Sequence, residues 1–310
     1  MQLTVEALTS GYPGHPAAVD GVDLTIPSGQ VAAIVGPNGC GKSTLLRSIS
    51  RLHKPSSGTV HAGDEDVWRL TQRRAAHRIA LLAQSPQAPE AVTVAGLVRY
   101  GRHPHQGLFR QWSREDEAAV REALEATGTT ELATRRLDHL SGGQRQRCWL
   151  AMVLAQQTPI VLLDEPTSAL DLGHAVEVLS LVREVAAAGR TVVMVLHDLA
   201  SAARYADTII AMNAGKIVAN GPAREVVTAE LVKELYGIDA DILQAPGDGS
   251  PVVVPTMTAM TAKAPGRVPE KVDEKSLGAP ADAATIPEQA PEAASTKAPA
   301  KAPAKAREPG

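Results

Sequence analysis

A glycine-rich loop constrains this chain more than any other stretch: it runs from Gly36 to Thr44 and reads Gly-Pro-Asn-Gly-Cys-Gly-Lys-Ser-Thr. It fits G-x-x-x-x-G-K-[ST], the phosphate-binding P-loop. The apolar run 31–35 comes directly before it and predicts a buried strand. Apolar residues at helical spacing follow it, namely Leu45, Leu46, Ile49 and Leu52. Strand, loop and helix in this order predict a site for a nucleoside triphosphate.

Each kind of residue in the loop has an expected role. The glycines let backbone N–H groups turn inward around a phosphate, where a Cβ would collide. A helix that starts near Lys42 adds its positive dipole end, and Lys42 offers a charge to the β- and γ-phosphates. Ser43 offers an oxygen to Mg²⁺. The predicted nucleotide-binding residues of the loop are Gly36, Asn38, Gly39, Cys40, Gly41, Lys42, Ser43 and Thr44.

Length and composition narrow the class of protein. The 310 residues, 44% of them hydrophobic, suit one large domain or two smaller ones with an ample core. A net charge of −3 gives no case for nucleic-acid binding. Cys40 and Cys148 are expected to be reduced, packed thiols of a cytosolic protein. No signal peptide is visible, and no apolar run approaches the roughly 20 residues that span a bilayer. If membranes matter, a partner supplies the span.

The apolar runs predict an α/β fold. Buried strands are expected at 31–35, 79–83, 159–165 and 191–196, and helices at 141–155 and 173–188. Near the N-terminus, two β-like pieces are expected around a turn at Gly11 to Pro16. Their apolar positions are Leu3, Val5 and Ala7, then Val22, Leu24 and Ile26.

Further segments complete this prediction. Hairpins are expected at 58–67 and 209–219, a polar helix at 70–76, a helix at 229–235 and an extended piece at 252–254. Residues 93–140 read as an inserted helical subdomain, with Thr93 as a cap and a capping box at Ser113–Asp116. From about residue 260 to 310, Pro, Ala, Lys and Glu dominate, which predicts a disordered tail.

Polar residues come directly after three of the predicted core strands. Gln84 follows the second strand, Asp164 and Glu165 end the third, and His197 follows the fourth. Ligands collect at the carboxyl ends of parallel strands. Asp164 is therefore the expected Mg²⁺ carboxylate and Glu165 the general base for an attacking water. Gln84 would sense Mg²⁺ or the γ-phosphate and His197 would contact the γ-phosphate, with ordinary loop or structural roles as the alternatives.

The stretch Leu140–Gln144 predicts a second anion site. A helix is expected to start at Ser141, so its first-turn N–H groups and the Ser141 hydroxyl would face an anion. One chain would then carry two phosphate-facing sets of groups, which suggests that two chains close around two nucleotides. The residues Ser168–Asp171 would lie at the contact between the two copies.

Taken together, these motifs resemble the nucleotide-binding subunit of ABC transporters over about residues 1–235. The resemblance is carried by Gly36–Thr44, Gln84, Leu140–Gln144, Ile160–Glu165, Asp171 and His197. It implies a P-loop NTPase core with an antiparallel β subdomain and an inserted α-helical subdomain, and ATP hydrolysis with ATP and Mg²⁺ as cofactors. It also implies the remaining nucleotide contacts: Tyr12 on adenine, and Ser141, Gly142, Gly143, Gln144 and Asp171 at the nucleotide of a partner subunit. On spacing alone, Tyr12 is as readily an ordinary surface tyrosine.

A closer resemblance is to the ATPases of ferric-siderophore importers. It is carried by Gly101–Gly107, Leu140–Arg147 with Trp149, Leu154–Gln156, and His197–Leu199 with Ala203–Asp207. It implies a second copy and a transmembrane permease as partners, indirectly an extracytoplasmic substrate-binding protein, and a place at the cytoplasmic face of the membrane. Gln84 would couple the site to the permease. Haem or cobalamin import and a soluble, non-transport ABC ATPase are the alternatives.

The domain boundaries follow from the same patterns. Residues 1–240 are expected to form the ATPase domain, with its helical subdomain at about 93–140. Residues 241–259 are a short C-terminal extension, and 260–310 the tail. The tail is expected to be dispensable for folding and hydrolysis.

Overall fold

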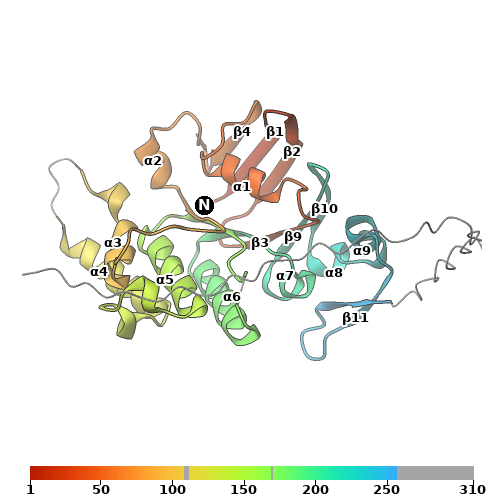
Figure 1. The fold of residues 1–310 in the computed structure, drawn as a ribbon. Helices are drawn as coiled ribbons and strands as arrows, with labels where there is room; N and C mark the ends of the chain where they lie inside the picture. Colours follow the sequence, from red (N-terminus) through yellow and green to blue (C-terminus); the bar gives the residue numbers. More distant parts are fainter. Residues whose placement is uncertain (108–111, 169, 257–310) are drawn as a thin grey trace, which may run out of the picture. The chain divides into compact units, whose positions relative to one another are not determined.

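The computed structural model describes residues 1–107, 112–168 and 170–256 (Figure 1). The predicted tail, 260–310, lies outside the described residues, as does Ala169. Among the described residues, no helix has both the length and the hydropathy needed to cross a membrane. The proposed division of the chain at residues 240 and 260 stays a prediction.

A six-stranded sheet forms the centre of the fold, in the order β10-β9-β3-β8-β7-β6. Its parallel strands are β3 (Val31–Val35), β6 (Ile79–Leu82), β7 (Ile160–Asp164), β8 (Thr191–Val195) and β9 (Thr208–Asn213). Strand β10 (Lys216–Gly221) runs antiparallel to β9. Because both faces of such a sheet are covered, its strands are continuous apolar runs, which is why the sequence predicts all four core strands correctly.

An antiparallel sheet of order β2-β1-β4-β5 accompanies the central one. Its strands are β1 (Leu3–Tyr12), β2 (His15–Ile26), β4 (Ser57–Ala62) and β5 (Glu65–Asp66). The predicted turn at Gly11 to Pro16 is too long, since the strands continue to Tyr12 and from His15. Ala7 is also misplaced: its φ of 46° forms a bulge that exposes it and buries Leu8 instead.

Helix α1 (Lys42–Ile49) follows the P-loop and contacts β1, β2 and β7. It ends one turn earlier than the apolar spacing predicts. Leu52 was expected on its buried face, but it lies beyond the helix end and is 68% exposed. Arg51, with a φ of 64°, reverses the chain at that point.

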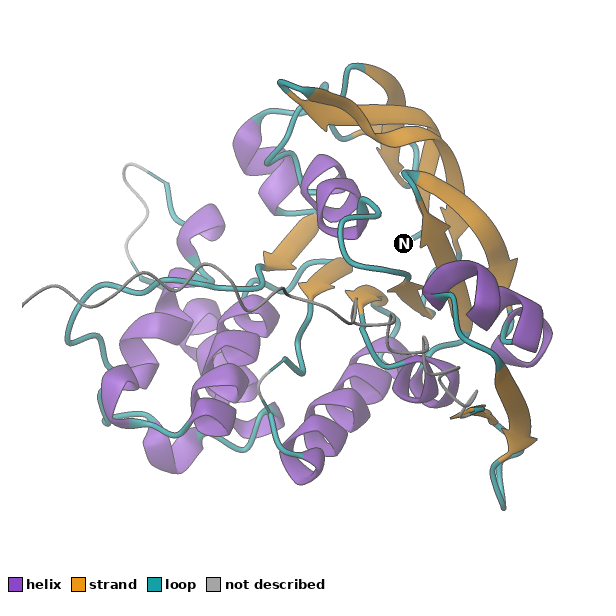
Figure 2. Cartoon of the chain, turned by 45° about the vertical axis from the view of Figure 1, so that its right-hand side comes forward, coloured by secondary structure: helices purple, strands orange, loops and turns teal. Residues whose placement is uncertain are grey.

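Three helices form a separate layer, which Figure 2 shows as a cluster apart from the antiparallel sheet. They are α3 (Val94–Tyr100), α4 (Arg114–Ala126) and α5 (Gly142–Ala155), and each contacts the other two. Thr93 caps α3, and Ser113 with Asp116 forms the predicted capping box of α4. Short 3₁₀ turns connect them, η1 (His103–His105), η2 (Thr130–Leu132) and η3 (Leu137–His139).

The remaining elements surround the core. They are α2 (Gln72–Ala76), α6 (Leu172–Ala187), α7 (Leu199–Tyr205), α8 (Ala223–Val226), α9 (Ala229–Tyr236), β11 (Ala240–Gln244) and β12 (Pro251–Pro255). The sequence prediction missed α7, α8 and β11. Strands β11 and β12 pair with each other, and the hairpin packs on α7 and α9.

The central sheet separates two hydrophobic cores, because successive side chains of a strand point to opposite faces. On β3, Val31, Ala33 and Val35 join the core that includes α5 and α6. Ala32 and Ile34 join the core of α1 and the antiparallel sheet. The P-loop leaves β3 at the carboxyl edge of this sheet, so both cores hold it in place.

Candidate functional site

The glycines of the P-loop allow close approach of neighbouring backbone as well as unusual φ angles. Gly36 and Gly41 have φ angles of 144° and 106°. A Cβ at Gly36 would overlap the carbonyl oxygen of Met212 at the end of β9, and one at Gly41 would overlap that of Ala18 in β2. From the sequence, the expected collision of such a Cβ was with phosphate. The structure shows that the chain's own backbone already excludes side chains at these two positions.

The side chain of Lys42 is buried inside the loop, with only 5% of the residue exposed. Its ammonium group donates hydrogen bonds to the carbonyl oxygens of Gly36 and Pro37, both at 2.8 Å. The thiol of Cys40 lies 3.9 Å from the same nitrogen. Burial raises the pKa of the Cys40 thiol, while Lys42 opposes that shift. Lys42 is therefore a desolvated cation within the loop, where its attraction for a phosphate is stronger than in water.

Ser43 and Asp164 form the pair expected to hold Mg²⁺. The Ser43 hydroxyl donates to Asp164 Oδ1 at 3.0 Å, which joins the start of α1 to the end of β7. Burial raises the pKa of Asp164, and the neighbouring Glu165 adds to this rise. A hydroxyl and a carboxylate at this distance fit Mg²⁺, which is usually held by one or two carboxylates together with substrate phosphates. Among the described residues, no cluster of three or more His, Cys, Asp or Glu side chains suggests another metal site.

Glu165 lies between two of the predicted strand-end residues. Gln84 Nε2, after β6, donates to Glu165 Oε2 at 2.6 Å, and His197 Nε2, after β8, lies 2.6 Å from Oε1. The Glu165 backbone has a φ of 54°, a strained conformation for a non-glycine residue. The structure therefore places Gln84, Glu165 and His197 together at the carboxyl edge of the central sheet, and their catalytic roles stay a prediction.

A cavity of about 210 Å³ opens over the P-loop. It is lined by Tyr12, Ala18, Asn38, Gly39, Gly41, Lys42, Ser43, Thr44, Glu165 and His197. The ring of Tyr12 contacts that of His53, with centroids 4.4 Å apart and the two planes tilted by 34°. The imidazole of His53 is held by the carbonyl oxygen of Gly11 at 2.7 Å. His53 thus backs Tyr12, a role that the sequence did not predict because 40 residues, helix α1 among them, lie between the two in the chain.

The predicted second anion site is at the start of α5. The Ser141 hydroxyl accepts from the Gln144 N–H at 3.3 Å, and Gln144 Oε1 accepts from the Ser141 N–H at 3.2 Å. The first N–H groups of a helix have no partner within the helix, and this capping box satisfies only that of Gln144 among them. Neither Ser141 nor Gln144 lines the P-loop cavity. Gly142 instead lines a separate cavity of about 330 Å³ together with Gln84 and Ser168.

Asp171 caps α6 and is bound to His174, a residue that the sequence argument did not consider. Asp171 Oδ1 accepts from the His174 N–H at 2.9 Å, and both carboxylate oxygens lie 2.8 Å from the imidazole Nδ1. The His174 N–H, followed by its imidazole, holds the pKa of Asp171 below its usual range. The spacing i, i+3 at a helix start is the sequence signal that was available for this contact.

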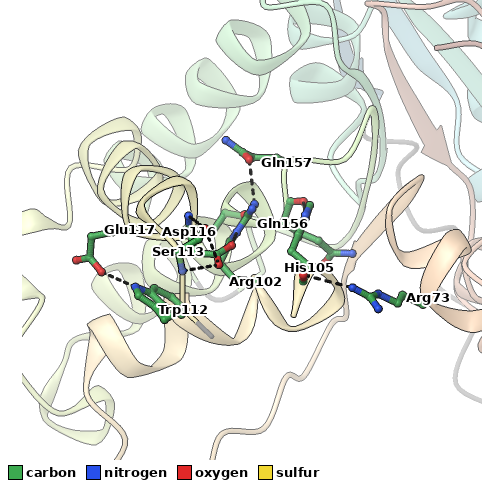
Figure 3. Close-up of polar contacts among 10 residues, drawn as sticks. Arg73, Arg102, His105, Trp112, Ser113, Asp116, Glu117, Gln156 and Gln157 are labelled. Atoms are coloured by element: carbon green, nitrogen blue, oxygen red, sulfur yellow. Dashed lines mark hydrogen bonds and ion pairs between the residues drawn. The ribbon is translucent and has the colours of Figure 1, made fainter. Parts of the chain in front are cut away.

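The segment Gly101–Gly107, which carries the closer resemblance, is held from several sides (Figure 3). Arg102 is buried and pairs with Asp116 at 2.9 Å, and it also donates to the carbonyl oxygen of Ala155. His105 lies 2.8 Å from the carbonyl oxygen of Gln156. Arg73 of α2 donates to the carbonyl oxygen of Pro104. Much of this segment therefore connects α2 to the layer of α3, α4 and α5 through hydrogen bonds and an ion pair.

Comparison with known families places these features in context. Residues 19–168 match the family model described as ABC transporter. The matched range contains the P-loop, Gln84, the stretch Leu140–Gln144, and Asp164 with Glu165.

Known transport proteins are similar over most of their length. The chain is 50% identical over 255 residues to the ferric enterobactin transport ATP-binding protein FepC of Escherichia coli K12, covering 82% of this chain and 94% of that protein. It is 47% identical over 254 residues to the achromobactin transport ATP-binding protein CbrD of Dickeya dadantii, at 82% and 94% coverage. It is 45% identical over 242 residues to the hemin import ATP-binding protein HmuV of Streptomyces coelicolor, at 78% and 85% coverage.

The solved structures that align with this chain are also described as parts of ABC transporters. The inward-facing structure of a transporter described as metal-chelate type aligns with a TM-score of 0.71 at 31% identity, over 82% of this chain and 96% of that one. The dimeric structure of a bacterial ABC transporter cassette aligns with a TM-score of 0.64 at 28% identity, over 71% of this chain and 98% of that one.

Proposed function

Since this chain belongs to the ABC transporter family and is an ATPase, we propose that it powers the uptake of a ferric siderophore through a separate membrane permease. The main support for this cargo is the 50% identity with an enterobactin transport ATP-binding protein over nearly the whole of that protein. A relative named for achromobactin transport supports the same class of cargo. The permease would hold the chain at the cytoplasmic face of the membrane, and a substrate-binding protein outside would deliver the cargo.

The geometry supports a division of roles at the P-loop. Lys42 and the loop N–H groups bind the β- and γ-phosphates, and Tyr12 stacks on adenine. Ser43 and Asp164, with Gln84 nearby, would hold Mg²⁺, which supplies charge neutralisation between the phosphates. Glu165 accepts a proton from the attacking water. His197, which lies against Oε1 of Glu165, contacts the γ-phosphate. Gln84 keeps the carboxylate of Glu165 oriented through its 2.6 Å hydrogen bond.

A second copy would complete each nucleotide site. Ser141, Gly142, Gly143, Gln144 and Asp171 are absent from the lining of the P-loop cavity. They would therefore serve a nucleotide held by another chain, as two copies close around two nucleotides. The dimeric cassette that aligns with this chain is a precedent for such an assembly.

Hemin import is the second candidate, because a hemin import ATP-binding protein is 45% identical to this chain. We favour the siderophore assignment because the enterobactin and achromobactin relatives are more similar to this chain than the hemin relative of Streptomyces coelicolor and match a larger share of their own length. The ATPase does not touch the cargo, so its own cavities do not decide between them.

Uptake by the native host tests the proposal. Deletion of the gene for this chain should abolish uptake of iron-labelled siderophore, and the wild-type chain supplied in trans should restore it. Supply of the Lys42→Ala chain should not, because the P-loop then lacks its buried cation. Unchanged siderophore uptake with a loss of haem or cobalamin uptake would move the assignment to those importers. No uptake defect at all would favour a non-transport ATPase.

A further inference from the structure

We propose that His174 is a positioning residue, which holds the first turn of α5 against the Asp171 turn at the start of α6. The inference deepens the proposed function and rests on it, because it takes the α5 turn to be the part that binds the nucleotide of a second copy. His174 lies outside the P-loop cavity. It contacts residues from both of the stretches expected at the interface between copies.

One side of the imidazole is fixed by Asp171. The carboxylate is ionised at neutral pH, so it accepts the hydrogen of Nδ1–H, whose nitrogen lies 2.8 Å from both carboxylate oxygens. The same carboxylate caps α6 through the His174 N–H at 2.9 Å. These two contacts set the tautomer of the neutral ring and the plane in which it lies. His174 is thus oriented before any ligand arrives.

The other side of the imidazole faces Gly143. A Cβ at Gly143 would lie 2.8 Å from both Cγ and Cδ2 of the ring and 3.2 Å from Nε2. Such distances are shorter than side-chain contacts tolerate, so a glycine is required for the helix to approach the ring this closely. Gly143 is itself buried. The Cγ–Cδ2 edge of the ring therefore packs against the first turn of α5.

Two further contacts join α5 to its neighbours, but they lie farther along the helix. Gln146 Nε2 donates to the carbonyl oxygen of Pro166 at 2.9 Å, and Arg147 pairs with Glu177 at 2.9 Å. They would keep α5 in place if the ring of His174 were removed. Loss of the ring should then alter the position of the first turn alone, while the P-loop and the fold stay intact.

The test compares dimer formation with nucleotide binding by single chains. In a Glu165→Gln background, which retains ATP, His174→Ala should weaken Mg-ATP-dependent dimerisation by roughly tenfold, because the first turn of α5 is then no longer held in position for the nucleotide of the second copy. Binding of a fluorescent ATP analogue to dilute, monomeric chains should not change, because the P-loop half of the site is untouched. A purely structural role would instead weaken both measurements and lower the thermal unfolding temperature.

Two variants control this comparison. Glu177→Gln removes the ion pair between Arg147 of α5 and Glu177 of α6 and should leave dimerisation unchanged. His174→Asn keeps an N–H donor close to the position of Nδ1 and should recover part of the loss. Dimerisation of His174→Ala equal to that of its parent would overturn the inference, as would equal losses in both measurements. If the Glu165→Gln parent itself forms no dimer with Mg-ATP, the proposed function fails and the inference fails with it.

Discussion

Glu165 combines two side-chain contacts with a strained backbone at a single position of the site. Its side chain is bound on one oxygen by Gln84 and on the other by His197, and its backbone has a φ of 54°. Strained backbone of this kind persists where the surrounding structure determines it, and it is common at functional sites. The Ser168 hydroxyl and N–H both donate to the Glu165 carbonyl oxygen and thereby hold this conformation.

Glu165→Gln should stop hydrolysis and spare nucleotide binding. The amide has the shape of the carboxylate and can still accept from Gln84, but it accepts no proton from water. We expect phosphate release to fall by about 10²–10⁴, the usual contribution of a general base. Gel filtration with Mg-ATP should then show a long-lived dimer. Turnover close to that of wild type would remove Glu165 from this role.

Residue types at strand ends were predictable, whereas contacts between distant segments were not. Gln84, Asp164 and His197 follow apolar runs, and parallel strands end at one edge, so their proximity follows from the sequence. The contacts of Tyr12 with His53 and of Gly143 with His174 depend on how loops and helices pack. No local pattern encodes them. The same holds for the close approach of Gly36 to the Met212 carbonyl, since the two residues lie at the ends of the neighbouring strands β3 and β9.

At the level of elements, helix caps were the most reliable signals. Thr93 and Ser113 cap their helices as predicted because a side-chain oxygen three residues before a free N–H needs no tertiary context. The short elements α7, α8 and β11 were missed, since four to seven residues carry too little periodicity to be recognised. In the structure α7 packs on β3 and β12, α8 packs on β9 and β10, and β11 packs on α9.

The Arg102–Asp116 pair joins three elements, since Asp116 also belongs to the capping box of α4 and Arg102 binds the end of α5 (Figure 3). Arg102→Met should lower the free energy of unfolding by about 3–5 kcal/mol, because it leaves a buried carboxylate unpaired. Combination with Asp116→Asn should recover much of this loss, since the charge is then removed as well. Urea unfolding measures both values.

The pH dependence of that loss has a definite sign. Burial alone would raise the pKa of Asp116, but the hydrogen bonds from Arg102 and Ser113 outweigh it and lower the pKa. The wild-type pair therefore stabilises the fold above the ordinary aspartate pKa of 3.8 and loses this contribution as the pH falls through the lowered value. In Arg102→Met the unpaired carboxyl protonates at higher pH. The gap between the two proteins should narrow on acidification; a constant gap would mean that Asp116 is not responsible.

On the scale of the whole molecule, the central sheet keeps apart the two sets of groups that are expected to face phosphate. The core of α1 and the antiparallel sheet holds the P-loop on one side, and the central sheet holds it on the other. The α5 turn belongs to the helical layer and lines a different cavity, with Gly142 and Gln84. A family-level sequence pattern places both sets in one chain. The three-dimensional structure shows that the two sets line different cavities.

This separation has a genetic consequence. If each nucleotide takes the P-loop of one chain and the α5 turn of another, two alleles that are each null can complement. Lys42→Ala disables a P-loop and Ser141→Arg blocks an α5 turn, so neither chain alone hydrolyses ATP. In a mixed pair, both lesions fall on the same nucleotide and the other site is intact. Co-expression should therefore restore hydrolysis and some cargo uptake, and a mixture as inactive as its parts would show that each chain acts alone.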